Sequence, residues 1–169
     1  MAEFSEEMAD YIRGWGIPKI LEDVKDDLVF KFDDDGISST IGMDYHCSEN
    51  SVKFCLYDTK LKKVLFTMDF YLKNNRCAFN DPVPRVNLQF IYTHSNTLRK
   101  KGIADYYIAK LQEYAIAQNM KCISITAVPN VVIDKNDNGL NRLKKHELEI
   151  FYKKRSTVEM PIKVRTLTS

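Results

Sequence analysis

The stretch VNLQFIYTHSNTLRKKGIADYYIAKLQEYAIAQNM, residues Val86–Met120, combines strand, loop and helix patterns in one run. VNLQFIYT is strand-like, HSNTL is a polar loop, and Arg99-Lys100-Lys101-Gly102-Ile103-Ala104 begins an amphipathic helix. A glycine set among basic residues at a helix start builds an anion site, because unpaired backbone N–H groups and the positive helix end point at the same spot. The motif therefore predicts a phosphate-bearing ligand.

The residues after this glycine have helical spacing. Ala104, Ile108, Leu111 and Ala115 recur at the intervals that place apolar side chains on one helix face. This spacing predicts a helix from Gly102 to about Gln118. The β-branched run that follows predicts a strand over Cys122–Val128.

The remaining chain alternates between helix and strand patterns. Expected helices begin at Ser5, run from Pro18 to about Asp27, and span Asn141–Arg155. Expected strands are Leu28–Phe32, Ile37–Tyr45, Val52–Tyr57, Val64–Leu72, Val86–Thr93 and Pro161–Leu167. This order predicts an α+β fold with a mixed, mostly antiparallel central sheet flanked by helices.

Length and composition favour an ordinary globular chain. The 169 residues predict a single domain, residues 1–169, and 44% hydrophobic with 28% charged residues is a common balance. The start is acidic and lacks a signal pattern, and no run is as long as a membrane span, so we expect a cytoplasmic protein without membrane contact.

Cysteine spacing and net charge exclude further classes. Cys47, Cys55, Cys77 and Cys122 are scattered, and the histidines complete no ligand spacing, so we expect reduced thiols and no metal. A pI near 8.2 does not favour nucleic acid as a partner. The basic residues of the C-terminal part keep nucleic-acid binding as a third alternative.

The glycine loop differs from two better-known phosphate sites. A P-loop needs GxxxxGK[ST], whereas Gly102 is followed by Ile103-Ala104. A dinucleotide fingerprint needs three spaced glycines, which are also missing.

The motif Arg99-Lys100-Lys101-Gly102-Ile103-Ala104 resembles the acetyl-CoA site of the GNAT superfamily of N-acetyltransferases, with its pattern Arg/Gln-x-x-Gly-x-Gly/Ala. The preceding strand end, Phe90–Thr93, stands where that family has the strand that contacts the pantetheine arm. A second stretch, Glu149–Arg155, resembles the family's late helix. The resemblance covers roughly Val64 to Leu167.

This resemblance implies a GNAT-like fold and transfer of an acetyl group from acetyl-CoA to a small-molecule or peptide amine, directly in a ternary complex. The backbone around Lys101, Gly102, Ile103 and Ala104 would hold the diphosphate, with Arg99, Lys100 and Lys101 adding attraction. A backbone N–H of the Ile91, Tyr92, Thr93 segment, exposed by a bulge, would stabilise the carbonyl oxygen.

The same resemblance suggests proton-transfer groups. Tyr152 stands where many members place a general acid, and a buried tyrosine that is hydrogen-bonded in the core is the alternative. Asp69 is the best carboxylate for a general base, with His94 or a water chain as alternatives. Ser156 and Thr157 stand where the family usually has Gly-Phe, so a CoA-binding module without chemistry is the rival hypothesis. The oligomeric state stays open, with a homodimer as one alternative.

Overall fold

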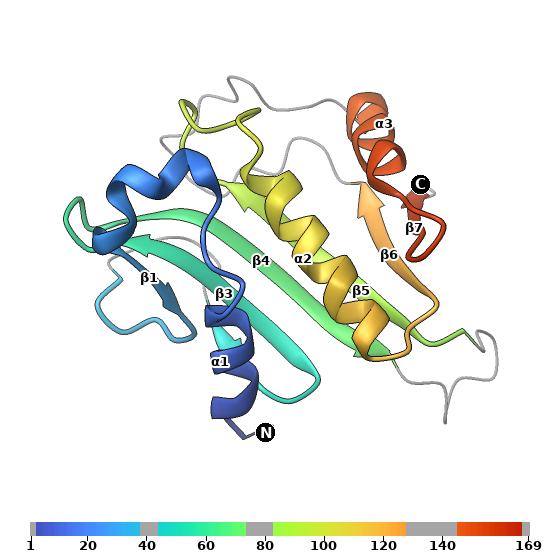
Figure 1. Ribbon diagram of the computed structural model, residues 1–169, viewed down its shortest axis with the longest axis horizontal. Helices are drawn as coiled ribbons and strands as arrows, with labels where there is room; N and C mark the ends of the chain where they lie inside the picture. The colour runs from blue at the N-terminus through green and yellow to red at the C-terminus, as the bar shows by residue number, and fades with distance from the viewer. Residues whose placement is uncertain (1–2, 38–43, 74–82, 128–144, 167–169) are drawn as a thin grey trace.

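The computed structural model describes residues 3–37, 44–73, 83–127 and 145–166 (Figure 1). Its elements follow one another as α1 (Glu6–Arg13), the 3₁₀ helix η1 (Lys19–Asp27), β1 (Leu28–Lys31), β2 (His46–Cys47), β3 (Ser51–Asp58), β4 (Lys63–Lys73), β5 (Arg85–Thr93), α2 (Ile103–Ala117), β6 (Cys122–Ala127), α3 (Lys145–Arg155) and β7 (Ile162–Thr166).

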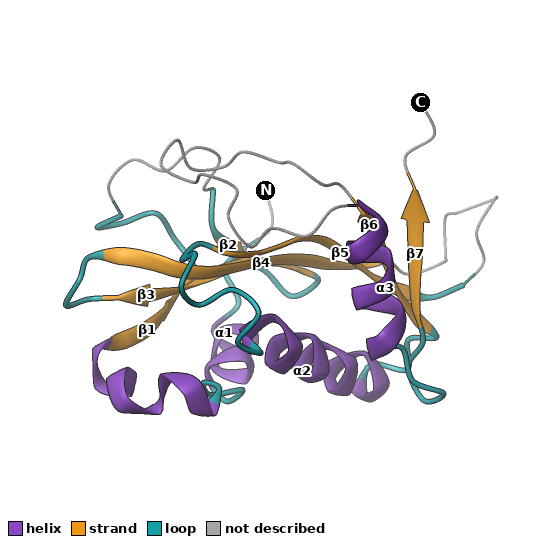
Figure 2. Cartoon of the chain, turned by 90° about the horizontal axis from the view of Figure 1, so that it is seen from above, coloured by secondary structure: helices purple, strands orange, loops and turns teal. Residues whose placement is uncertain are grey.

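The strands form one sheet in the order β1-β3-β4-β5-β6-β7, with β2 paired to β3. Pairing is antiparallel from β1 to β5 and parallel from β5 through β6 to β7. Figure 2 shows α1 and α2 on the same face of this sheet, with α3 beside α2. The predicted α+β class, a mixed and mostly antiparallel sheet flanked by helices, is confirmed.

Aromatic side chains fill the space between the sheet and α2. The rings of Phe66 and Tyr107 stack with centroids 4.8 Å apart, and Phe54 meets Tyr107 edge-on at 6.1 Å. The Tyr107 hydroxyl donates to the Gly16 carbonyl at 3.0 Å, which fixes the corner between α1 and η1 against α2. This core packs the N-terminal half of α2 against the sheet.

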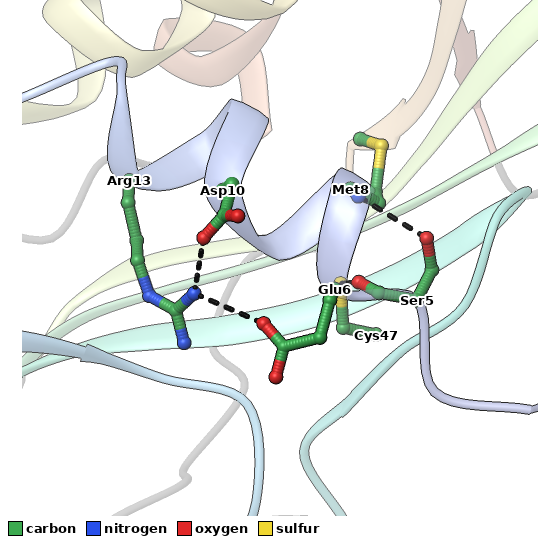
Figure 3. Close-up of polar contacts among 6 residues, drawn as sticks. All are labelled: Ser5, Glu6, Met8, Asp10, Arg13 and Cys47. Atoms are coloured by element: carbon green, nitrogen blue, oxygen red, sulfur yellow. Dashed lines mark hydrogen bonds and ion pairs between the residues drawn. The ribbon is translucent and has the colours of Figure 1, made fainter.

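Ser5 caps α1 and links this helix to the sheet (Figure 3). Its Oγ accepts a hydrogen bond from the Met8 N–H at 3.1 Å, and its own N–H donates to the Cys47 carbonyl at 2.9 Å. On the exposed side, Arg13 pairs with Asp10 at 2.7 Å. The predicted helix start at Ser5 is confirmed.

Replacing Ser5 with alanine should destabilise the fold by about 1 kcal/mol, because the Met8 N–H loses its acceptor. The midpoint temperature of thermal unfolding should then fall by roughly 2–4 °C. Ser5→Asp, which keeps an acceptor oxygen at the cap, serves as the matched control and should unfold close to the wild type. Equal losses in the two variants would contradict a capping role.

Two predicted elements differ in the structure. The Pro18–Asp27 helix is a 3₁₀ helix over Lys19–Asp27, where Leu21 is the only buried side chain and no long apolar face supports an α-helix. The predicted strand Ile37–Tyr45 is wrong at its described ends, since Ile37, Asp44 and Tyr45 lie outside strands. Asp44 has φ of 47°, which breaks an extended backbone. Positions 38–43 lie outside the described residues.

Other boundaries agree closely with the sequence pattern. The predicted strand over Cys122–Val128 is present as β6, with Val128 outside the described residues, and the predicted last strand is present as β7. The late helix is described from Lys145 onward, and positions 141–144 lie outside the described residues. Among the described helices, none combines the length and apolar character needed to cross a bilayer.

Candidate functional site

Strands β5 and β6 separate at the end of the sheet that carries the N-terminus of α2. Their parallel pairing runs from Arg85–Cys122 to Leu88–Ile125. Beyond Leu88, β5 stays paired with β4, whereas β6 continues alongside β7. Figure 1 shows the two strands diverging toward their carboxyl ends, with the first turn of α2 over the divergence. The last residues of β5 therefore form an edge that β6 does not cover.

A bulge marks the start of this uncovered edge. Asp69 pairs with Phe90 but Phe70 pairs with Leu88, so Gln89 is an extra residue in β5. An extra residue shifts the alternation of side chains. As a result Leu88 and Ile91 both contact the core on the α2 side of the sheet. The expected bulge is thus present, just before the Ile91–Thr93 segment.

The backbone of Ile91 and Thr93 faces the uncovered edge. The His94 N–H donates to the Leu65 carbonyl on β4 at 2.9 Å. In an antiparallel ladder the residues that bond to one neighbour alternate with residues that point to the other side. Ile91 and Thr93 are an odd number of residues from His94, so their N–H groups point in the opposite direction. They point away from β4, toward the space between β5 and β6.

Arg99 stabilises the loop between β5 and α2 through several hydrogen bonds. Its side chain is only 8% exposed, and its Nε donates to the Thr93 carbonyl at 2.9 Å. Its two terminal nitrogens donate at 2.5 Å to Asn96 Oδ1 and to the Tyr92 hydroxyl. The guanidinium also lies 4.9 Å from the Tyr92 ring centroid. Arg99 therefore fixes the loop geometry while adding a positive charge beside it.

Helix α2 begins at an open, positively charged corner. Gly102 has φ of 91°, and a Cβ built on it would meet no described atom within 4 Å. Lys100, at φ of 62°, and Lys101 are exposed on the same loop. Ile103 is buried, which anchors the first turn to the core. The first N–H groups of a helix lack intrahelical acceptors, so this corner presents donors beside lysines.

Tyr152 lies on α3 within the core cluster. It is 5% exposed, and burial raises the pKa of its phenol above the ordinary value. Among the residues that the structure describes, no hydrogen-bond partner of its hydroxyl is found. Three residues further along, Arg155 contacts Asp105 in the first turn of α2. That contact, together with Gln112 Nε2 donating to the Arg155 carbonyl at 2.7 Å, holds α3 beside α2.

Asp69 lies on the opposite face of the sheet, beside the bulge. Burial raises the pKa of its carboxyl, while Lys53 and His46 act in the other direction. Lys53 is its cross-strand neighbour on β3. Asp69 and Tyr152 therefore flank the sheet from opposite faces, and within the described part of the chain no contact joins them.

The alternative base, His94, belongs to a separate hydrogen-bond network on the face of the sheet opposite α2. Its Nε2 lies 2.8 Å from Thr67 Oγ1, which lies 2.9 Å from the Tyr45 hydroxyl. The sequence analysis did not predict this hydrogen-bond network, because Tyr45 was expected inside a strand. The contact between Asp105 and Arg155 was missed as well. The one sequence feature that could have indicated it is the acidic Asp105 in the first turn of a helix that follows two lysines.

The sequence matches no protein-family model and no curated protein. Solved structures with a similar fold include an aminoglycoside acetyltransferase from an uncultured soil metagenomic sample, with 16% identity, TM-score 0.43, and 72% of this chain matched to 68% of that one. A GNAT family acetyltransferase of Staphylococcus aureus matches at 16% identity and TM-score 0.37, covering 53% of this chain and 66% of that one. The aminoglycoside N-acetyltransferase AAC(6')-Iy, solved with CoA, matches at 15% identity and TM-score 0.38, covering 54% and 69%.

The matched region is partial on both sides. The chain spans between 54% and 62% of the length of three further solved structures from Bacillus halodurans with which it shares 13–18% identity. The neighbours include GNAT acetyltransferases, the superfamily that the loop motif resembles, and the likeness is one of fold. Identities and TM-scores of this size leave the chemistry to be argued from the residues of this chain.

Proposed function

We propose that this chain, as a single domain of residues 1–169, is a cytoplasmic acetyltransferase of the GNAT type. It moves an acetyl group from acetyl-CoA to a primary amine on a small molecule or peptide, by direct transfer in a ternary complex. The observation that carries this proposal is the uncovered edge of β5 next to the open N-terminus of α2. A long ligand with a diphosphate and an amide-containing arm fits these adjoining features.

The two features match the two parts of coenzyme A. The N–H groups of Lys101, Gly102, Ile103 and Ala104 would bind the diphosphate, with Lys100 and Lys101 adding charge. The free space before Gly102 supports this assignment, since a phosphate oxygen needs to approach the backbone there.

The amides of the pantetheine arm would pair with Ile91 and Thr93 in the manner of an added strand. Tyr92 would act indirectly, because its hydroxyl accepts from Arg99 and so helps to fix the end of β5. An Ile91 N–H aimed at the acetyl carbonyl would stabilise the negative charge that develops on its oxygen during attack.

Two titratable side chains are assigned to proton transfer. Deprotonating an amine of pKa near 10.4 costs about 4–5 kcal/mol of free energy at pH 7, so a general base would speed the reaction. Asp69, beside the bulge, is our candidate for this base. The departing thiolate leaves more readily when it takes a proton, and Tyr152 is the candidate donor. Their positions on opposite faces suit a reaction in which the amine enters from one side and the thiol leaves toward the other.

The described cysteines support direct transfer over an acyl-enzyme intermediate. Burial raises the pKa of Cys47 to about 11 and that of Cys55 to about 12, so both stay protonated at neutral pH. Cys122 is also buried. A protonated, buried thiol is a poor nucleophile. Cys77 lies outside the described residues.

Calorimetry with acetyl-CoA and CoA, followed by a thiol-release assay over a panel of amines, tests this function. We expect saturable binding of both nucleotides and acetyl-CoA-dependent thiol release with at least one amine class. The absence of binding to well-folded protein would overturn the proposal.

The burial of Tyr152 favours one alternative, a CoA-binding module of the same fold that has no catalytic activity. A phenol that solvent barely reaches is also typical of a side chain that only fills the core. Saturable CoA binding without thiol release across peptides, polyamines and amino sugars would favour this alternative.

Asp69→Asn should lower kcat and remove the acid limb of the pH profile of kcat/KM. The carboxylate has to be ionised to accept a proton, and burial raises its pKa, so the acid limb of the wild type should lie above the ordinary aspartate range of about 3.9. Asp35→Asn, at an exposed turn, is the control and should leave the profile unchanged. An acid limb that survives in Asp69→Asn would assign the base to another group.

A further inference from the structure

An acidic side chain lies in the first turn of α2, where the proposed diphosphate site is. Asp105 is the third residue of the helix, directly after Ile103 and Ala104. A carboxylate in the first turn stabilises a helix through the helix dipole. The same carboxylate repels an anionic ligand bound at that helix start. Asp105 therefore opposes the ligand that this corner would otherwise attract.

Arg155, from the end of α3, is fixed against this carboxylate. Its Nε donates to Asp105 Oδ1. One terminal nitrogen donates to the Phe151 carbonyl at 2.6 Å, and its guanidinium carbon lies 3.5 Å from the centroid of the Phe151 ring. The Arg155 side chain is 24% exposed. An arginine held by these contacts is oriented before any ligand arrives.

We propose that Arg155 is a positioning residue that neutralises Asp105 and thereby sets the affinity of the α2 corner for a diphosphate. This inference rests on the proposed function and names a residue that acts through another one. The charges of the pair cancel, so the net field at the corner comes from the helix dipole and from Arg99, Lys100 and Lys101. Without Arg155, the Asp105 carboxylate would subtract from that field.

A second ion pair on the same helix provides a matched control. Lys110 Nζ lies 3.6 Å from Glu113 Oε2 and 5.4 Å from the Tyr106 ring centroid, so it also combines a carboxylate partner with an aromatic ring. At a rise of 1.5 Å per residue, Lys110 is about 10 Å further along the helix axis than Ile103. Removing this cation changes the net charge equally, but far from the helix start.

The experiment is a double-mutant cycle in the full chain, measured by calorimetry with CoA and with pantetheine, which lacks the diphosphate. Arg155→Met should weaken CoA binding roughly tenfold and leave pantetheine binding unchanged. Asp105→Asn alone should bind CoA at least as tightly as the wild type. The double variant should return to wild-type affinity, and Lys110→Met should bind like the wild type.

Restored CoA affinity in the double variant separates neutralisation from other roles. A double variant as weak as Arg155→Met would overturn the proposal and assign a direct phosphate contact to Arg155. Equal weakening of CoA and pantetheine would overturn it as well, because a purely structural loss does not discriminate between the ligands. Failure of the wild type itself to bind CoA would instead refute the proposed function, so the two failures are distinguishable.

Discussion

Gly102→Val should weaken CoA binding by at least about a hundredfold, equivalent to roughly 2.7 kcal/mol. Gly102 has φ of 91°, where an L side chain is strained, and a β-branched one most of all. A Cβ there would enter open space beside the first turn of α2, and in the proposed complex that space belongs to the diphosphate. Calorimetry with CoA measures the effect on binding, and thermal unfolding measures the strain separately.

Gly36→Val is the control for backbone strain. Gly36 has φ of 76° in the exposed turn after β1, and among the described atoms its Cβ would come within 4 Å of Lys31 Nζ alone, at 3.4 Å. This variant should lose stability to a similar extent yet bind CoA like the wild type. If both valine variants lost CoA binding equally, strain and not the occupied space would explain the result, and the assignment of the diphosphate to this corner would be wrong.

The sequence predicted those elements whose pattern is local. Strands β3, β4 and β5 and helix α2 carry continuous alternation or helical spacing, and their predicted bounds agree with the structure within a few residues. The junction between β5 and α2 was predictable for the same reason, because strand, loop and helix start are adjacent in the chain. Burial of one face decides each of these elements, and that information is present in consecutive residues.

Contacts between distant segments could not be predicted in this way. Arg155 meets Asp105 across 50 positions, and the orientation of either side chain depends on how α3 lies beside α2. Tyr45 has strand propensity but contacts Thr67 on the outer face of the sheet, because the backbone turns at Asp44. In both cases tertiary contacts, which local propensity does not contain, determine the outcome.

For Tyr152 the sequence left two alternatives open, a general acid and a buried tyrosine of the core. Its motif indicated a proton donor near the reacting thiol, whereas the structure places the side chain in the core cluster with a phenol pKa raised by burial. The phenol is protonated at neutral pH, which is the state that a general acid requires, but its raised pKa makes it a weaker proton donor. Burial therefore limits both access to the hydroxyl and its acidity, and the rate of a variant without the hydroxyl measures what remains.

Tyr152→Phe should lower kcat by roughly a hundredfold, within the range of about 10²–10⁴ that general acids contribute, and leave the Kd for CoA nearly unchanged. The ring stays in the core, and among the described residues the hydroxyl has no hydrogen-bond partner to lose. The variant should therefore unfold at a temperature close to that of the wild type. Single-turnover thiol release measures the chemical step without product release.

Tyr107→Phe is the matched control, since it removes a buried phenol that donates to Gly16 at 3.0 Å on the same face of the sheet. This control should lose roughly 1 kcal/mol of stability and keep its rate. Because the pKa of Tyr152 is raised, its ionisation should not limit kcat below about pH 10, where an ordinary tyrosine titrates. An unchanged rate in Tyr152→Phe would remove this residue from the mechanism and leave water as the proton donor to the thiolate.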